Sequence, residues 1–169
     1  MRRAVIVSGA RTPIGKFGGA FKSYSASDLG AVAIKAALER AGLDPAQVDE
    51  VVMGNAIQAA DSGYAVRLAA LQAGIPKEVP AIAINRQCSS GLEAINLAAM
   101  MIRAGEVDVV VAGGIENMSM IPYLLRKVRW DGLRLGDSVM EDGVVLGLSC
   151  PVNQYHMGVT AENVAAAFE

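Results

Sequence analysis

Short apolar runs alternate with longer stretches of helical periodicity through the first two thirds of this chain. The short runs predict strands buried on both faces, at 4–7, 51–53, 79–84 and 107–114. Apolar residues at helical spacing predict helices between them, at 29–38, 63–73 and 92–102. This alternation predicts an α/β layered fold, with a mostly parallel mixed sheet and helices on both of its faces.

Capping residues mark the expected ends of the first helices. Ser27 and Asp28 are expected to cap the helix at 29–38, and Gly42 to end it. Asp44, followed by a proline, predicts a short helical turn before the second strand.

The helix predicted at 92–102 is apolar on nearly every face, which is typical of a helix buried on all sides. Ser90 and Glu93 have the S-x-x-E spacing of a capping box at its start. Gly105 stands just after its end, where a left-handed residue closes many helices.

One thiol, Cys88, lies in the turn between the strand at 79–84 and this helix. The free N–H groups and the dipole of a helix start favour a negative charge, and the thiolate is the nucleophilic form of cysteine. The same N–H groups could hold the oxyanion that forms when a thiolate attacks a carbonyl. Parallel sheets bind ligands outside the carboxyl ends of their strands, where Cys88 is expected. By position alone, a buried structural cysteine explains Cys88 equally well.

A glycine-containing stretch at 9–16 invites comparison with a phosphate-binding loop. Five residues, rather than four, separate Gly9 from Gly15, and Phe17 stands where a Ser or Thr would hold the metal ion. A structural turn is therefore expected there.

After residue 114 the periodicity fades, and three segments are expected. They are an α/β core carrying Cys88 at 1–118, a loop subdomain at 119–158, and the start of a helix returning to the core at 159–169. No cap, glycine or polar tail follows that helix, so a truncated chain is expected. The loop carries a basic cluster around Trp130, consisting of Arg126, Lys127, Arg129 and Arg134. Taken alone, this cluster fits a solvated surface that Asp131, Asp137, Glu141 and Asp142 balance.

Composition narrows the class of protein. The 169 residues suit one domain. Hydrophobic residues make up 53% of the chain but aromatic residues only 5%, which indicates an aliphatic core. A net charge of −2 gives no reason to expect nucleic-acid or membrane partners, and no apolar run is long enough to cross a bilayer. Two cysteines without a secretory signal indicate reduced thiols, which makes the cytoplasm the expected location.

Four motifs resemble those of the thiolase family, in family order, and together they cover the chain from end to end. They are V-S-G-A-R-T-P-I-G at 7–15, N-R-Q-C-S-S-G-L at 85–92, A-G-G-I-E-N-M-S at 112–119 and Y-H-M-G-V-T-A-E-N at 155–163. The second resembles the family's nucleophile motif, and the fourth resembles the motif that lines its acyl pocket. The chain is thus similar to the N-terminal half of a thiolase, which favours Cys88 as nucleophile.

The resemblance implies a reaction and a set of substrates. Thiolases interconvert two acyl-CoA molecules with a 3-ketoacyl-CoA and free CoA through an acyl-cysteine, which Cys88 would carry. His156 and Met157 match residues that shape the pocket around the thioester, and Leu148 matches a contact to the CoA tail. The basic cluster matches the region that meets the CoA nucleotide. CoA, acetyl-CoA and acetoacetyl-CoA are then substrates; no metal or bound cofactor is implied, and a homodimer or homotetramer is expected.

Two departures from the family pattern matter. The family's second half supplies an activating histidine and an acid/base cysteine, and neither motif is present in these residues, so this chain alone is expected to be inactive. Cys150 lacks the glycines of the acid/base motif and is interpreted as a bystander. The nucleophile motif resembles degradative, longer-chain thiolases, whereas the motif around His156 resembles the acetoacetyl-CoA type; the latter is favoured because it lines the pocket.

Other classes of function stay open beside this one. A ketoacyl synthase also uses a cysteine at a buried helix, but the motif at 155–163 argues against it. A cysteine hydrolase pairing Cys88 with His156 leaves the other motifs unexplained. A scaffold or assembly piece without catalysis is the non-enzymatic alternative.

Overall fold

The computed structural model describes residues 2–58, 63–130 and 132–168. The chain divides into two compact units, Met1–Met120 and Ile121–Glu169. Each unit is described by itself. The sequence pattern predicts the end of the core at residue 118. Among the described residues, no helix combines the length and the apolar character needed to cross a membrane.

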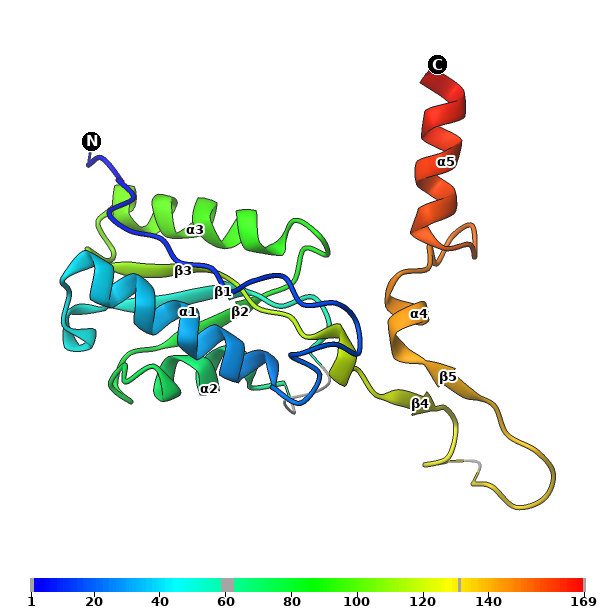
Figure 1. The fold of residues 1–169 in the computed structure, drawn as a ribbon. Coiled ribbons are helices and arrows are strands. Elements are labelled where there is room, and N and C mark those ends of the chain that lie inside the picture. Colours follow the sequence, from blue (N-terminus) through cyan, green and yellow to red (C-terminus); the bar gives the residue numbers. More distant parts are fainter. Residues whose placement is uncertain (1, 59–62, 131, 169) are drawn as a thin grey trace. The chain divides into compact units, whose positions relative to one another are not determined.

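The first unit is built on a parallel sheet of three strands in the order β2-β1-β3 (Figure 1). The strands are β1 at Glu50–Gly54, β2 at Ala81–Ile84 and β3 at Val110–Gly114. Val52 of the central strand pairs with Ile82 on one side and with Ala112 on the other. The α/β fold with a parallel sheet, expected from the alternating pattern, is confirmed.

Helices cover both faces of this sheet, as expected (Figure 1). The helices α1 at Ala26–Ala41 and α2 at Ala65–Gln72 pack against each other on one face, and α3 at Ser90–Ala104 covers the other. Successive strand residues point to opposite faces. Val51 and Met53 therefore join the core cluster with α1 and α2, while the fully buried Val52 points toward α3.

The expectation of strands buried on both faces holds for β1 alone. All five residues of β1 are buried, whereas β2 and β3 are only partly buried. The reason is their position, because β2 and β3 form the two edges of the sheet. The expected strand at 4–7 is wrong: this segment forms no strand, and Val5, Ile6 and Val7 are exposed. An apolar run becomes a strand only where a neighbouring backbone pairs with it.

The cap of α1 lies two residues earlier than expected. Ser25, rather than Ser27, is the N-cap: its hydroxyl accepts from the Asp28 N–H, and the Asp28 carboxylate accepts from the Ser25 N–H. The expected end at Gly42 is confirmed by its left-handed conformation, with φ at 66°. The expected helical turn is a 3-10 helix at Pro45–Gln47.

The helix α3 differs from the expectation of a helix buried on all sides. Only Ser90, Ala94 and Ala98 are buried, and they form the face that meets the sheet. Leu92 is 64% exposed and Met100 is 48% exposed. Among the described residues of the first unit, nothing covers the outer face of α3, so its apolar pattern predicted burial that this unit alone does not supply. The end at Gly105 is confirmed, with φ at 84°.

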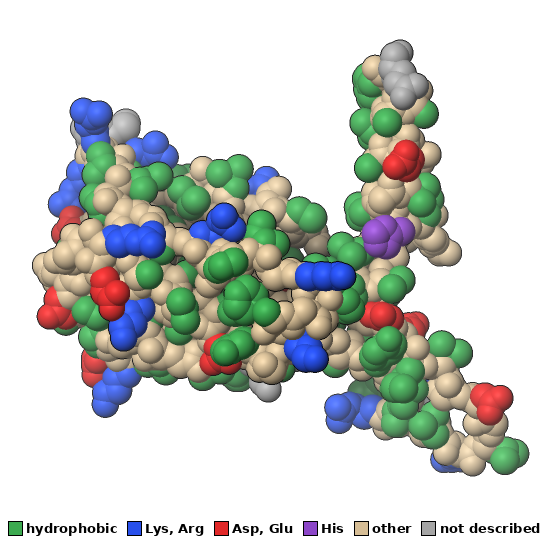
Figure 2. Space-filling model, viewed as in Figure 1, with side chains coloured by type: hydrophobic (Ala, Val, Ile, Leu, Met, Phe, Trp, Pro, Cys, Tyr) green, Lys and Arg blue, Asp and Glu red, His purple; other side chains and the backbone are tan. Residues whose placement is uncertain are grey.

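The second unit contains a small antiparallel hairpin and two helices. The strands β4 at Tyr123–Leu125 and β5 at Met140–Asp142 pair with each other, and α4 follows at Gly143–Gly147. The helix α5 spans Met157–Phe168, and hydrophobic side chains lie along its surface (Figure 2). Of the basic cluster, Arg126 forms an ion pair with Glu141 across the hairpin, while Trp130 is 85% exposed. Asp131, expected to balance this cluster, lies outside the described residues.

Candidate active site

Cys88 lies in the turn between β2 and α3, and it is exposed. The turn reverses the chain so sharply that the preceding residue, Gln87, has a left-handed backbone with φ at 52°. A residue other than glycine in this conformation costs about 1–3 kcal/mol, which the surrounding contacts must offset. A strained turn that presents an exposed thiol is a feature often found at functional sites.

The first turn of α3 is held by Ser90 in a way that the sequence did not predict. The expected capping box is wrong, because the N-cap is Ser89 and Ser90 already lies inside the helix. The buried Ser90 hydroxyl instead accepts from the Arg86 N–H at 2.8 Å and donates to the Gln87 carbonyl at 2.5 Å. Glu93 forms an ion pair with Arg86 at 2.8 Å rather than turning back to the backbone. Ser90 thus ties the turn to the helix from within.

The start of α3 also presents unpaired donors close to Cys88. Among the described residues, the N–H groups of Gly91 and Leu92 have no acceptor. Gly54, at the end of β1, approaches this turn so closely that a Cβ there would lie 2.5 Å from the Gly91 nitrogen. Free N–H groups at a helix start favour an anion, whether a thiolate or a developing oxyanion.

Three polar residues to which the sequence assigns no role lie at the same end of the sheet, where the parallel strands have their carboxyl ends. Asn55 directly follows β1, Asn85 directly follows β2, and Glu116 comes soon after β3. Burial raises the pKa of Glu116, and hydrogen bonds from the backbone N–H groups of Ile57 and Ala56 and from Asn55 partly offset this. The signal that could have found them is the one that drew attention to Cys88, namely a polar residue after a buried parallel strand.

The other predicted site residues, Leu148, His156 and Met157, belong to the second unit. There they lie together: the Met157 N–H donates to the Leu148 carbonyl at 2.8 Å, and Ser149 forms a bridge with His156. The Gly158 N–H donates to Nδ1 of His156 at 3.0 Å. His156 and Met157 are exposed and Leu148 is half-buried. The structure brings these three together where the chain passes from α4 to α5, while Cys88 belongs to the first unit.

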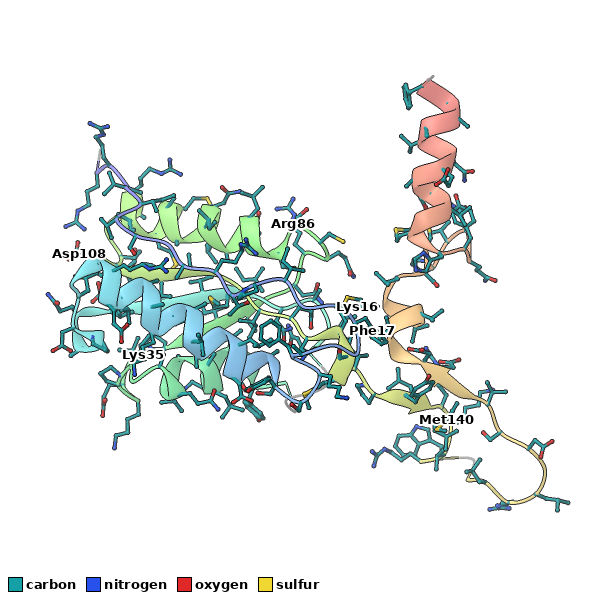
Figure 3. All side chains as sticks on the ribbon, viewed as in Figure 1. Lys16, Phe17, Lys35, Arg86, Asp108 and Met140 are labelled. Carbon is teal, nitrogen blue, oxygen red and sulfur yellow. The ribbon has the colours of Figure 1, made fainter. Side chains whose placement is uncertain are left out.

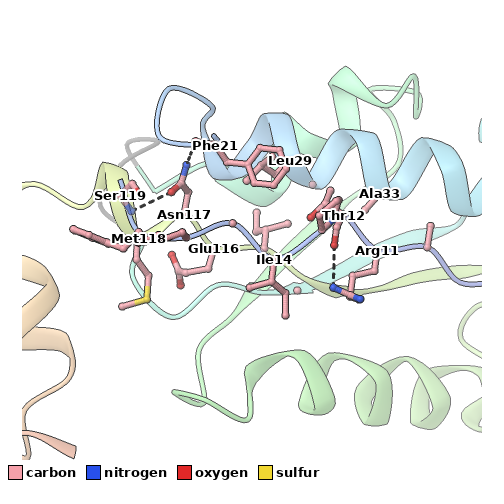
Figure 4. A pocket seen from close by; sticks show the side chains of 18 residues that line it. Arg11, Thr12, Ile14, Phe21, Leu29, Ala33, Glu116, Asn117, Met118 and Ser119 are labelled. Carbon is pink, nitrogen blue, oxygen red and sulfur yellow. Dashed lines mark hydrogen bonds between the residues drawn. The ribbon is translucent and has the colours of Figure 1, made fainter. Parts of the chain in front are cut away.

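A cavity of about 420 Å³ lies elsewhere in the first unit (Figure 4). Residues 10–17, residues 114–119 and one side of α1 line it, and Cys88 does not. The thiol of Cys88 therefore lies outside this cavity. Asn117, at its rim, donates to the carbonyls of Phe21 and Tyr24 and so secures the chain before α1. Among the described residues, no three His, Cys, Asp or Glu side chains gather to hold a metal ion.

Comparisons with known proteins point to one family. The family model for the N-terminal domain of thiolase matches residues 4–169. An acetyl-CoA acetyltransferase of Cupriavidus necator is 53% identical over 99% of this chain and 43% of its own length. An acetyl-CoA acetyltransferase of Escherichia coli is 48% identical, again over 43% of its length. The chain thus spans less than half the length of these relatives.

Solved structures give the same picture. The crystal structure of a Bacillus anthracis acetyl-CoA acetyltransferase matches 99% of this chain, and 42% of its own chain, with a TM-score of 0.94 and 44% identity. The human mitochondrial 3-ketoacyl-CoA thiolase, solved in complex with CoA, matches 95% of this chain and 41% of its own, with a TM-score of 0.90 and 42% identity.

Proposed function

The chain belongs to the thiolase family by its N-terminal domain, and from this premise we propose that the protein is an acyltransferase that works through an acyl-cysteine on Cys88. The reaction proposed is the condensation of two acetyl-CoA molecules to acetoacetyl-CoA and CoA, or the reverse thiolysis. The observation that carries the proposal is the exposed thiol of Cys88 at the start of α3, on a strained turn beside unpaired N–H groups.

In the first half of the reaction, the Cys88 thiolate attacks the carbonyl carbon of acetyl-CoA. The carbonyl oxygen becomes an oxyanion, for which the free N–H groups of Gly91 and Leu92 are candidate donors. The carbon–sulfur bond to CoA then breaks, and CoA leaves as a thiolate that takes up a proton. The acetyl group stays on Sγ of Cys88 as a thioester.

In the second half, a base removes a proton from the α-carbon of a second acetyl-CoA. The resulting carbanion attacks the acetyl-cysteine carbonyl, and the bond to Sγ breaks to release acetoacetyl-CoA and the Cys88 thiolate. We assign substrate contacts to Leu148, His156 and Met157, which lie together between the end of α4 and the start of α5. The exposed members of the basic cluster would meet the phosphates of CoA. The proposal includes no metal and no bound cofactor.

The choice of an acetoacetyl-CoA type over a longer-chain thiolase rests on the motif at His156 and Met157 and on the relatives named acetyl-CoA acetyltransferase. The likeness to human mitochondrial 3-ketoacyl-CoA thiolase supports the second candidate, a longer-chain 3-ketoacyl-CoA thiolase. The rates of thiolysis of acetoacetyl-CoA and of a 3-ketoacyl-CoA with a longer chain distinguish the two.

We also propose a cytoplasmic homodimer or homotetramer. Exposed apolar side chains support an assembly, among them Leu92 on α3 at 64% exposed and Leu135 in the second unit at 100%. Sedimentation of the natural protein at micromolar concentration is expected to show a dimer or tetramer, and a purely monomeric species would refute this part.

The central experiment is the detection of the acyl-enzyme. After incubation with acetyl-CoA and rapid quenching, peptide mass spectrometry is expected to find an acetyl group on Cys88 and none on Cys150. The substitution Cys88→Ser is expected to abolish both the thioester adduct and turnover. If the wild-type protein forms no acetyl adduct and shows no turnover, the result supports the non-catalytic scaffold instead.

A further inference from the structure

The polar side chains after the three strands are joined into one hydrogen-bonded chain that ends at Cys88. Asn55 follows β1, Asn85 follows β2, and Glu116 comes soon after β3. All three lie in the first unit, at the carboxyl ends of the strands. The proposed reaction assigns none of them a role, although each is connected to the turn that carries the nucleophile.

The chain begins at the half-buried carboxylate of Glu116. Its Oε2 accepts from two successive backbone donors, the N–H groups of Ala56 and Ile57, each at 3.0 Å. Its Oε1 accepts from Nδ2 of the buried Asn55 at 3.1 Å, and Asn55 also donates to the Ile115 carbonyl at 3.2 Å. Both carboxylate oxygens are therefore engaged, in charge-assisted bonds that are stronger than those between neutral groups.

The peptide group between Ala56 and Ile57 passes the connection to Asn85. Its N–H donates to Glu116, and its carbonyl, on Ala56, accepts from Nδ2 of Asn85 at 2.9 Å. The side-chain oxygen of Asn85 then accepts from the Gln87 N–H at 3.0 Å. One asparagine side chain thus spans from the loop after β1 to the strained residue before Cys88.

The last link lies in the turn itself. The peptide group that contributes the Gln87 N–H also contains the Arg86 carbonyl, which accepts from the Ser89 N–H at 3.2 Å. That N–H shares a peptide group with the carbonyl of Cys88. From Glu116 to Cys88, every amide donates toward the carboxylate, and each one before the last also accepts from the next. Such head-to-tail amides polarise one another in the same direction.

We propose that Glu116 and Asn85 are positioning residues for Cys88, which hold the left-handed turn at Gln87 and so fix the thiol relative to the start of α3. The proposal rests on the proposed function, because positioning matters for catalysis only if Cys88 takes up an acyl group. Left-handed Gln87 needs such support, since its backbone conformation is unfavourable by itself.

The same clamp occurs at the opposite end of the sheet, which provides a matched control. One oxygen of Asp49 accepts from the successive N–H groups of Asp108 and Val109, at 2.8 and 2.9 Å. Figure 3 shows Asp108 and Arg86 at opposite ends of the first unit. Loss of Asp49 removes a carboxylate clamp between the starts of β1 and β3, and it leaves the turn at Cys88 untouched.

The test compares Asn85→Ala and Glu116→Ala with Asp49→Ala in the natural protein. The rate of acetyl transfer from acetyl-CoA to Cys88 is measured over a range of acetyl-CoA concentrations by quenched mass spectrometry. Hydrogen exchange of a peptide covering 86–92 reports the rigidity of the turn. Thermal unfolding of each variant measures the general effect on folding.

The expected result for Asn85→Ala and Glu116→Ala is a fall of about 10²-fold in the saturating acetylation rate, the effect of misplacing a reacting group by about 1 Å. The half-saturating acetyl-CoA concentration is expected to stay within about threefold, because binding of CoA does not use the turn. Exchange in 86–92 is expected to rise about tenfold on loss of these bonds. Asp49→Ala is expected to lower the unfolding temperature while leaving the acetylation rate and the exchange unchanged.

Three outcomes decide the matter. The positioning role is overturned if Asn85→Ala and Glu116→Ala have the same acetylation rate and the same hydrogen exchange in 86–92 as the wild-type protein. An equal loss of acetylation in Asp49→Ala also overturns it, because the effect is then one of folding. If the wild-type protein is never acetylated on Cys88, the proposed function fails; faster exchange in the two variants but not in the control would then still support the mechanical link from Glu116 to the turn.

Discussion

The closest backbone approach in the candidate site, at Gly54, leads to a sharp prediction. A Cβ added at Gly54 would lie 2.5 Å from the Gly91 nitrogen, 2.5 Å from the Ser90 carbonyl carbon and 2.7 Å from the Ser90 Cβ. Ordinary van der Waals contact begins at 3.4 Å. Two of these three atoms are backbone atoms, so no side-chain rotation relieves the clash. In Gly54→Ala, the start of α3 must therefore move away from β1 by about 1 Å.

The size of the effect follows from this displacement. Overpacking of this kind typically costs about 1–3 kcal/mol of unfolding free energy. A shift of about 1 Å at the helix start moves Cys88 as well, which corresponds to about a 10²-fold loss in the rate of acetyl transfer. Urea unfolding measures the first quantity, and quenched mass spectrometry of acetylated Cys88 measures the second.

Gly113→Ala is the matched control, from the neighbouring strand. A Cβ at Gly113 would meet the flexible end of the Met53 side chain, with Sδ at 3.2 Å and Cε at 3.4 Å. Because that thioether can move, we expect a change in unfolding free energy below about 1 kcal/mol and an unchanged rate. The reasoning is refuted if Gly54→Ala is as stable as Gly113→Ala and acetylates Cys88 equally fast.

The remaining predictions concern the thiols, turnover and acid stability. In the folded protein, limiting iodoacetamide is expected to label the exposed Cys88 before the half-buried Cys150, as measured by peptide mass spectrometry. Preferential labelling of Cys150 would contradict the assignment of Cys88 as the reactive thiol. The 169-residue chain alone is expected to catalyse thiolysis of acetoacetyl-CoA at least about 10²-fold more slowly than a full-length thiolase, because His156 is its only histidine and is assigned to the pocket. Equal rates, followed by absorbance, would make His156 the base. Hydrogen bonds led by the Ser25 N–H lower the pKa of Asp28 below its ordinary value of 3.8, so its contribution to stability is present at neutral pH and is lost as pH falls through the lowered pKa. Urea unfolding of Asp28→Asn should therefore show lower stability than wild type at pH 7 and a narrowing difference below about pH 4; a difference independent of pH would refute this.

Much of the fold, and the placement of Cys88 between a strand and a helix, could be predicted from local sequence. Gly42 and Gly105 end their helices as expected, because a left-handed residue closes a helix whatever packs around it. The strand–turn–helix unit around Cys88 was also expected, since an apolar run, a polar break and a helical pattern are each visible within a few residues. Signals of this kind depend on neighbours in the chain.

Only the tertiary structure decided the features that depend on residues far apart in sequence. The segment at 4–7 has the composition of a strand, but no backbone pairs with it in the described residues. The S-x-x-E spacing of Ser90 and Glu93 is also real, yet Arg86 competes for the Glu93 carboxylate and the turn competes for the Ser90 hydroxyl. A carboxylate binds the partner that offers the better charge and geometry, and sequence spacing does not reveal that partner.

The difference between what the sequence and the tertiary structure determine is largest at the carboxyl ends of the strands, near Cys88. The sequence by itself determined that Cys88 follows a strand and precedes a helix. It did not determine that Glu116, whose carboxylate lies 28 positions further along, is linked to that turn through Asn85 and the loop after β1. That link exists because the strand order β2-β1-β3 places the three strand ends side by side, and each buried polar group there must find a partner across the sheet.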